Sequence, residues 1–86
     1  MAFVYLLECR DGTYYCGWTN DLNKRVAAHN AGSASKYTRS RTPVRLVYSK
    51  RLPDRNAAMR LEYRLKRMTR AQKKALIAGK KTRIPQ

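Results

Sequence analysis

Two apolar, aromatic-rich runs near the start of the chain, separated by a short turn, constrain its fold most. Residues 3–7 are continuously apolar, residues 10–12 read Arg-Asp-Gly, and residues 13–18 read Thr-Tyr-Tyr-Cys-Gly-Trp. Aromatic and β-branched side chains favour the pleated surface of a strand, whereas Asp-Gly favours a tight turn. The pattern predicts that the chain begins with an antiparallel hairpin.

The length of the turn decides which residues share a face of this hairpin. A two-residue Asp-Gly loop would turn Tyr5 and Tyr15 to opposite faces. A three-residue loop that ends with Gly12 in the left-handed region instead puts both phenols on one face. In that register Tyr15 pairs with Leu7, and Tyr5 pairs with Gly17, whose missing side chain leaves space beside the phenol ring. We predict this second register.

A helix over residues 21–30 is predicted to follow the hairpin. It is expected to begin behind a cap at residues 19–20 (Thr-Asn) and to stop at Gly32. Its expected buried stripe consists of Leu22, Val26 and Ala27. Arg25 and His29 flank that stripe on neighbouring turns, so both polar side chains can reach over the sheet.

Two further helices are predicted in the second half of the chain. One covers residues 55–68 behind an N-cap at Asp54, because its apolar positions recur at steps of three and four. These positions are Ala58, Leu61, Leu65 and Met68. The last helix opens with a capping box at residues 69–72 (Thr-Arg-Ala-Gln) and stops at Gly79.

Residues 44–49 alternate partially and predict a third strand. The predicted fold class is therefore α+β, with a three-stranded antiparallel sheet flanked by helices in the order ββαβαα. The first strand is expected in the middle of the sheet, because a continuous apolar run indicates burial on both faces. We expect a single domain over residues 1–79 and a basic tail over residues 80–86.

The charge balance of the chain predicts its partner. Twenty Lys and Arg face five Asp and Glu, which gives a net charge of +15 over 86 residues. Such self-repulsion weakens a compact state unless a polyanion offsets it, so we expect nucleic acid as the partner. A membrane surface is not favoured, because no long apolar run is present. Cytoplasmic localisation is expected, with Cys9 and Cys16 reduced and packed in strands.

Residues 31–42 form a small, polar and basic stretch without periodicity, which predicts a long surface loop. Its side chains are of the types that contact phosphate and stack on bases. The alternative is a flexible connector whose charge is simply solvated. Together with two residues of a later basic run, the predicted nucleic-acid-binding set is Lys36, Tyr37, Arg39, Arg41, Arg64 and Lys66.

Glu62 is the one acidic residue that fits no turn, cap or simple strand position. It interrupts a basic run at the edge of a buried helical stripe, which points it toward the sheet. One interpretation is an i,i+4 ion pair with Lys66, a weak surface interaction. The other is a metal ligand, because Mg²⁺ keeps several waters and needs few protein carboxylates.

These residues together resemble the GIY-YIG nuclease family. The motif residues are Phe3-Val4-Tyr5 on one strand, Tyr15-Cys16-Gly17 on the next, and then Arg25, His29 and Glu62. Small single-domain bacterial members of the YhbQ type are the most similar, over residues 3–77. Either triplet alone is a weak signal, whereas the joint spacing of all these residues is specific.

The resemblance implies a metal-dependent endonuclease that hydrolyses DNA phosphodiester bonds, with DNA favoured over RNA and a role in DNA repair. It implies one Mg²⁺ or Mn²⁺ ion on Glu62 and a Tyr5 phenol that helps deprotonate the attacking water. Tyr15 would position the water or a phosphate oxygen, Arg25 would neutralise developing charge, and His29 would assist Tyr5. A nearby cation and metal would favour the phenolate form of Tyr5.

Several alternatives stay open from the residues alone. Trp18 stands where many family members carry a lysine, which bears on turnover. Without a recognition domain, structure-dependent or weakly specific cutting is expected, or specificity supplied by a partner protein. Tyr5 and Tyr15 could be half-buried strand aromatics, and His29 an exposed helix-end residue. A noncatalytic module that binds DNA or RNA is then the alternative function.

Overall fold

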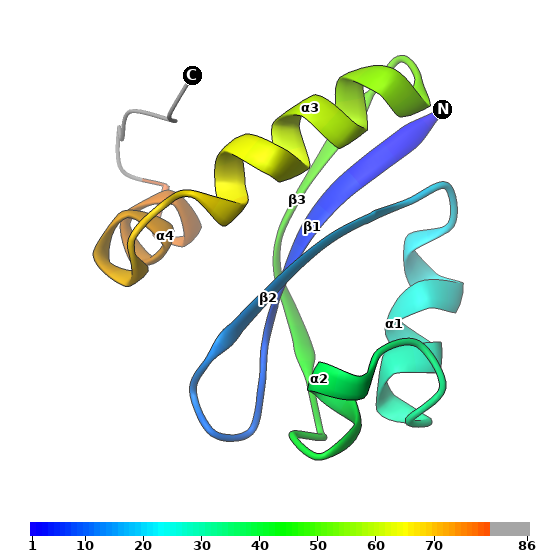
Figure 1. Cartoon of the computed structure of the whole chain (residues 1–86), viewed down its shortest axis with the longest axis vertical. Helices are drawn as coiled ribbons and strands as arrows, with labels where there is room; N and C mark the ends of the chain where they lie inside the picture. Colours follow the sequence, from blue (N-terminus) through cyan, green and yellow to red (C-terminus); the bar gives the residue numbers. More distant parts are fainter. Residues whose placement is uncertain (80–86) are drawn as a thin grey trace.

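The protein is built on a three-stranded antiparallel sheet with strand order β2-β1-β3. In the computed structural model, which describes residues 1–79, the strands are β1 (Ala2–Glu8), β2 (Tyr14–Thr19) and β3 (Arg45–Leu52). The predicted α+β class and the central place of the first strand are confirmed (Figure 1). The predicted basic tail over residues 80–86 lies outside the described residues.

Helices cover both faces of this sheet (Figure 1). They are α1 (Leu22–Asn30), α2 (Lys36–Arg39), α3 (Arg55–Lys66) and α4 (Arg70–Ile77). The caps predicted for α3 and α4 are confirmed: Asp54 accepts a hydrogen bond from the Ala57 amide at 2.8 Å, and Thr69 begins a complete capping box. Each cap satisfies backbone N–H groups that the first turn leaves unpaired.

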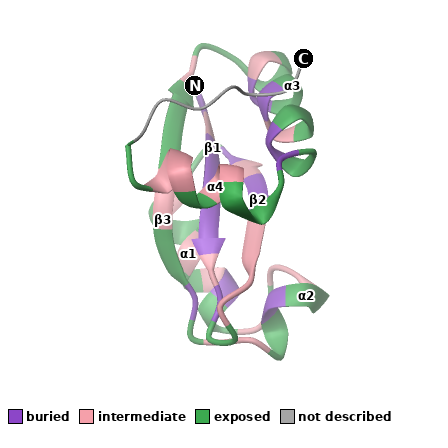
Figure 2. Ribbon diagram, turned by 90° about the vertical axis from the view of Figure 1, so that its left-hand side faces the viewer, coloured by how far each residue is buried: buried purple, intermediate pink, exposed green. Residues whose placement is uncertain are grey.

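Alternate residues of β1 enter two separate cores, one on each face of the sheet. Val4 and Leu6 pack toward α3 and α4, whereas Tyr5 and Leu7 pack toward α1. The predicted stripe of α3 is buried in the first of these cores: Ala58, Leu61, Leu65 and Met68. Burial is accordingly deepest along β1, while β3 is largely exposed at the edge of the sheet (Figure 2).

The predicted hairpin register is confirmed. Tyr5 pairs with Gly17 and Leu7 pairs with Tyr15, so the two phenols lie on one face. Gly12 has a φ of 83°, the left-handed conformation expected at the end of the three-residue turn. The space that Gly17 leaves is filled by Tyr5, whose hydroxyl would lie 2.5 Å from a Cβ atom at this position.

Helix α1 differs from the sequence prediction at its cap and in its buried stripe. Asp21, not Thr19 or Asn20, is the N-cap of α1, because its carboxylate accepts from the Lys24 amide at 3.1 Å. Thr19 is instead buried at the end of β2. Ala27 is exposed rather than buried, so Leu22 and Val26 form the apolar stripe without it.

The predicted loop over residues 31–42 also contains the short helix α2, which begins behind Ser35. The Ser35 hydroxyl accepts a hydrogen bond from the Tyr37 amide at 3.1 Å, so a serine cap starts this single turn. Strand β3 extends beyond the predicted residue 49 to Leu52, because it pairs with β1 along its length. Helix α3 ends at Lys66, two residues before the predicted end.

We predict that Gly17→Ala destabilises the protein by about 1–3 kcal/mol, the usual cost of overpacking a filled core. The added methyl group would meet the Tyr5 ring, which must shift. Urea denaturation measures the change in the free energy of unfolding. Ser49→Ala is the matched control, since Ser49 is exposed and lies opposite Tyr5 on the other neighbouring strand. Equal stability of both variants would contradict the tight packing at Gly17.

Candidate active site

A cleft of about 450 Å³ lies over the edge strand β2, where α1 and α3 approach it. It brings together the phenols of Tyr5 and Tyr15, the Arg25 guanidinium and the Glu62 carboxylate, which come from four different elements. The full lining is Tyr5, Tyr15, Gly17, Trp18, Thr19, Asn20, Arg25 and Glu62. Polar side chains that are far apart in the sequence and converge on one cleft are typical of a functional site.

Glu62 faces this cleft and also meets the cation one turn along its helix. Its backbone carbonyl accepts a hydrogen bond from the Cys16 thiol at 3.9 Å, which places this turn of α3 over β2. Its side chain is 21% exposed and lies 3.8 Å from the Lys66 ammonium. The surroundings of Glu62 therefore fit both an ion pair with Lys66 and a metal ligand. The ion pair is long, so an oxygen of the carboxylate stays accessible from the cleft.

His29 does not line the cleft but lies directly behind Tyr5. The imidazole is 1% exposed, which overturns the alternative of a solvent-exposed helix-end histidine. Its Nε2 atom lies 2.9 Å from the Tyr5 hydroxyl, and its Nδ1 atom lies 2.8 Å from the Thr38 hydroxyl. The ring of Tyr15 packs against the imidazole as well, with 5.0 Å between ring centroids.

The hydrogen-bond network favours one tautomer of His29. The Thr38 hydroxyl donates to the Ser35 carbonyl at 3.4 Å, so it accepts from His29 through an Nδ1–H group. The Nε2 atom then carries no proton and accepts the Tyr5 O–H. Phenol, imidazole and hydroxyl form one directed chain, with all three side chains at most 2% exposed.

Electrostatics agree with this assignment. Burial raises the pKa of Tyr5 above its ordinary value, Tyr15 and Glu62 raise it further, and Arg25 partly offsets them. Burial and the nearby Arg25 lower the pKa of His29. Without a bound metal ion, desolvation therefore raises the pKa of Tyr5 more than Arg25, the cation expected to favour its phenolate form, lowers it. At neutral pH the phenol holds its proton and the imidazole is neutral.

Comparison with known proteins identifies the family. Residues 1–75 match the family model described as the GIY-YIG catalytic domain. The chain belongs to the GIY-YIG family. This is a nuclease family whose members generally use divalent metal ions.

Similar proteins carry the designation UPF0213. One from Halobacterium salinarum is 55% identical over 76 residues, which is 88% of this chain and 99% of the relative. One from Clostridium perfringens is 49% identical over 80 residues, 93% of this chain and 86% of the relative. The solution NMR structure of a UPF0213 protein from Bacillus halodurans has 43% identity and a TM-score of 0.59, covering 93% of this chain and 86% of that one.

Thr38 is a residue of this GIY-YIG domain that the sequence reasoning missed. It lies in the stretch predicted as a long surface loop, yet it is fully buried and hydrogen-bonded to His29. The available signal was Ser35 three residues earlier, since Ser, Thr, Asn and Asp begin helices and a helical turn would bring Thr38 inward. Sequence alone offers no partner for that hydroxyl.

Two of the predicted nucleic-acid-binding residues have partners inside the GIY-YIG domain. The ring of Tyr37 is stacked on Tyr15, with 5.9 Å between centroids and 29° between planes. The Arg41 guanidinium lies 4.0 Å from the centre of the Tyr37 ring and binds the Asp11 carboxylate at 2.9 Å. Arg41 thus fastens the loop after α2 to the hairpin turn.

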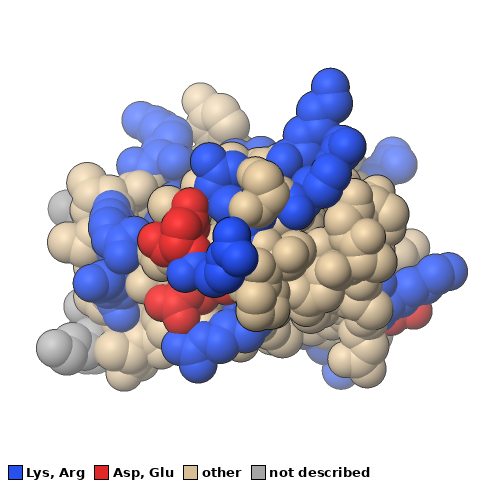
Figure 3. Space-filling view, turned by 90° about the horizontal axis from the view of Figure 1, so that it is seen from below, with Lys and Arg blue, Asp and Glu red and all other residues tan. Residues whose placement is uncertain are grey.

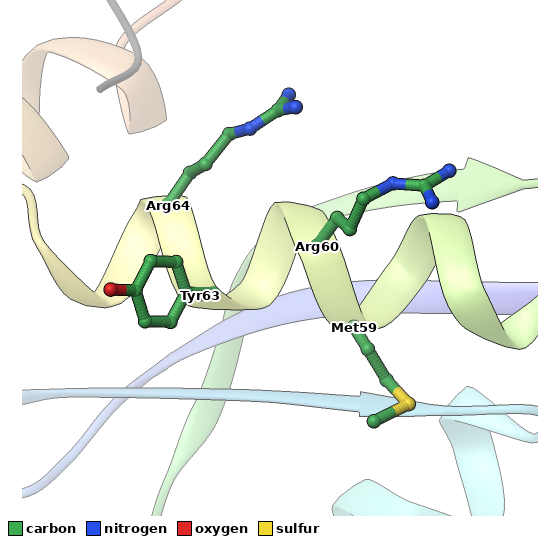
Figure 4. Close-up of a pocket in the computed structure, with 4 residues that line it drawn as sticks. All are labelled: Met59, Arg60, Tyr63 and Arg64. Atoms are coloured by element: carbon green, nitrogen blue, oxygen red, sulfur yellow. The ribbon is translucent and has the colours of Figure 1, made fainter. Parts of the chain in front are cut away.

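The other predicted binding residues are exposed cations at different places. Lys36 and Arg39 are exposed on α2, and Lys66 is exposed beside Glu62. Arg64 lines a separate hollow on the outer side of α3, where Arg60 and Arg64 extend together and Met59 extends the other way (Figure 4). The end view shows basic side chains spread widely, with acidic groups against them (Figure 3).

The cleft of this GIY-YIG domain suits a hard cation that keeps most of its water. No group of three or more His, Cys, Asp or Glu side chains is placed to enclose a metal within residues 1–79. Glu62 is the carboxylate that lines the cleft, with phenolic oxygens nearby. One carboxylate with waters is the ligand set that Mg²⁺ accepts. Every helix in the described range is too short and too polar to cross a bilayer.

We predict that stability falls as the pH is lowered through about 6.5, the pKa of an unfolded histidine. Because burial lowers the pKa of folded His29, the unfolded chain takes up this proton first. The contribution of His29 to the free energy of unfolding is therefore complete above pH 6.5. Below this pH it decreases by up to about 1.4 kcal/mol per pH unit. Urea denaturation at several pH values measures this slope.

His29→Gln is the control for this prediction, since His29 is the single histidine of the chain. The variant is expected to be less stable at pH 7.5 but to have a flatter dependence between pH 7.5 and pH 5.5. The same slope in both proteins would show that His29 is not a buried neutral group.

Proposed function

We propose that the protein is a divalent-metal-dependent endonuclease that hydrolyses DNA phosphodiester bonds with structure-dependent or weak sequence specificity. One observation carries the proposal: Tyr5, Tyr15, Arg25 and Glu62 line a single cleft, with His29 hydrogen-bonded behind Tyr5. Membership of a nuclease family supports hydrolysis, and the net charge of +15 supports a polyanionic substrate.

Glu62 would hold one Mg²⁺ or Mn²⁺ ion in this cleft. When bound, such an ion supplies Lewis acidity toward a phosphate oxygen and stabilises negative charge there. Arg25 reaches the same cleft from the first turn of α1, and its guanidinium offers donors to the phosphate oxygens that gain charge during attack.

The buried chain behind Tyr5 gives its phenol a route for a proton. The Tyr5 hydroxyl proton passes to the bare Nε2 atom of His29, while the Nδ1–H group stays bonded to Thr38. The resulting phenolate accepts a proton from the attacking water as the water oxygen bonds to phosphorus. Tyr15 orients this water or a phosphate oxygen, and the leaving oxygen takes a proton from solvent. After the reaction Tyr5 releases one proton to solvent, and His29 returns its extra proton to Tyr5, which restores the site.

A noncatalytic nucleic-acid-binding module, for DNA or RNA, is the second candidate. One observation favours it: Trp18 lines the cleft at the position where many family members carry a lysine. An indole supplies an apolar face but no charge for a scissile phosphate. The two candidates differ in whether a metal ion converts binding into cleavage.

We predict that the purified protein nicks supercoiled plasmid DNA in the presence of Mg²⁺ or Mn²⁺ and not in EDTA. Glu62→Gln and Tyr5→Phe should lower the rate by at least about 100-fold, because they remove the metal ligand and the acid–base group. Their affinity for DNA in EDTA should stay close to that of the wild type. Agarose-gel and anisotropy measurements give both quantities.

Glu8→Gln is the matched carboxylate control, since Glu8 is paired with Arg45 and lies outside the cleft. It should nick plasmid at the wild-type rate. Equal nicking by the wild type and Glu62→Gln would exclude Glu62 as the metal ligand. Binding without metal-dependent cleavage of plasmid, branched DNA or RNA would favour the noncatalytic module.

We predict that Thr38→Val lowers the nicking rate by at least about tenfold, whereas Thr38→Ser retains most of it. Valine cannot accept from the Nδ1–H group, so the imidazole loses the tautomer that receives the Tyr5 proton. The pH–rate profile is the decisive readout, because a purely structural defect would lower the rate without moving the acidic limb. Equal profiles for Thr38→Val and Thr38→Ser would argue against the chain.

A further inference from the structure

A second hollow, of about 250 Å³, lies beside the catalytic cleft and is not used by the proposed hydrolysis. It lies across the strand β2 near the hairpin turn, between α2 on one side and α3 and α4 on the other. Its lining is Tyr14, Tyr15, Cys16, Tyr37, Lys66 and Lys73. Pockets that enclose whole small-molecule ligands usually start at about 300 Å³, so this hollow suits a smaller group.

Three tyrosines line the hollow from the two sides of the edge of β2: Tyr14 lies on the face of Cys16, and Tyr15 lies with Tyr37 on the opposite face. Tyr14 is held by Arg70, whose guanidinium lies 5.2 Å from the centre of the ring and donates to the Gly12 carbonyl at 2.7 Å. Tyr15 and Tyr37 are stacked with an offset, and Tyr37 remains 37% exposed. Rings fixed in place by their neighbours lose little conformational freedom when a flat ligand stacks on them.

Two lysines give the hollow its charge. Lys66 comes from the end of α3 and Lys73 from the first turn of α4, and both line the hollow together with the tyrosines. The hollow itself is lined by no carboxylate of the described chain, although Lys66 is 3.8 Å from Glu62 at the border with the cleft. Aromatic faces beside ammonium groups match a base attached to a phosphate.

The hollow and the catalytic cleft are consecutive along one strand. Tyr15 lines both, and the cleft continues at Gly17 and Trp18. Each residue of a strand advances about 3.3 Å, so the two sites are separated by roughly 7–10 Å. Within residues 1–79, β2 is an edge strand that pairs with β1 alone, so its outer edge can follow an extended ligand. Neighbouring nucleotides of one strand can therefore occupy the two sites.

We propose that this hollow, formed by Tyr14, Tyr15, Tyr37, Lys66 and Lys73, binds an unpaired base next to the phosphate that is cut. The base lies against the ring of Tyr14 at the edge of β2, and the lysines contact its phosphates. In a duplex the bases are stacked and paired, so only a single strand, a flap or an opened junction can fill the hollow. The inference rests on the proposed nuclease function in one respect, namely that the neighbouring cleft holds the phosphate that is cut.

Binding in EDTA tests the proposal without any hydrolysis. Fluorescence anisotropy compares a labelled single-stranded oligodeoxythymidine, an oligonucleotide of the same length made of abasic residues, and a hairpin duplex. The wild type should bind the base-bearing single strand at least about fivefold more tightly than the abasic strand, the lower end of base–aromatic stacking. It should also prefer the single strand to the duplex at equal charge.

Two variants assign this preference to the hollow. Tyr14→Leu should bind the base-bearing and abasic strands equally, because the stacking surface is lost. Lys73→Gln should weaken both strands alike and reduce the salt dependence by about one ion. Tyr63→Leu and Lys50→Gln are the matched controls, since Tyr63 is an exposed tyrosine and Lys50 an exposed lysine outside the hollow. Both should keep the wild-type preference.

Three results of the oligonucleotide binding measurements would overturn the proposal. In the first, the wild type binds base-bearing and abasic strands equally. In the second, folded Tyr14→Leu still prefers the base-bearing strand. In the third, the Tyr63→Leu control loses this preference as fully as Tyr14→Leu does. Polyglutamate is included as a competitor, because an acidic peptide could also follow the free edge of β2. Competition by polyglutamate that depends on Tyr14 and Lys73 would assign the hollow to a peptide instead.

The outcome is independent of the nuclease test. A base preference that is lost in Tyr14→Leu, together with no metal-dependent nicking, would support the hollow and refute the nuclease. Metal-dependent nicking without any base preference would support the nuclease and refute the hollow. If both hold, Tyr14→Leu should lower cutting of single strands or flaps by at least about fivefold.

Discussion

The hydrogen bond between the Tyr5 phenol and the His29 imidazole joins the parts of the site. Tyr5 comes from the central strand and His29 from α1, and Thr38 extends the same chain into α2. A buried polar group without a partner costs about 1–3 kcal/mol, so each member of this chain requires the next one. Gly17 completes the constraint, because the phenol occupies the space where any side chain would be. The Tyr5 oxygen is thereby fixed at the wall of the cleft.

Charge is arranged around this neutral, buried chain. In the described residues, Glu8 and Asp11 are bound to arginines at the surface, whereas Glu62 lines the cleft together with Arg25. A carboxylate and a guanidinium in one cleft, in a chain of net charge +15, can attract a metal ion and a phosphate to the same place. The same surplus of cations supplies Lys66 and Lys73 to the adjoining aromatic hollow.

Local patterns were sufficient for most of the fold. The hairpin register followed from Gly12 and the side-chain alternation, and α3 and α4 followed from their caps and apolar spacing. The shared face of Tyr5 and Tyr15 followed from the same alternation, whereas their meeting with Glu62 was expected from the family resemblance, because α3 packs on the other face of the sheet. Helix α2 was missed, because a four-residue helix has little intrinsic stability and the Ser35 cap is its one local signal. Its order comes from the distant contact between Thr38 and His29, which local sequence does not encode.

The protonation state of His29 tests the central claim most directly. The chain has a single histidine, so a long-range ¹H–¹⁵N spectrum at pH 7.5 reports on this ring alone. The buried chain predicts a neutral imidazole with the proton on Nδ1 and a bare Nε2 that accepts the Tyr5 proton. A proton on Nε2, or a charged imidazolium at this pH, would contradict the account.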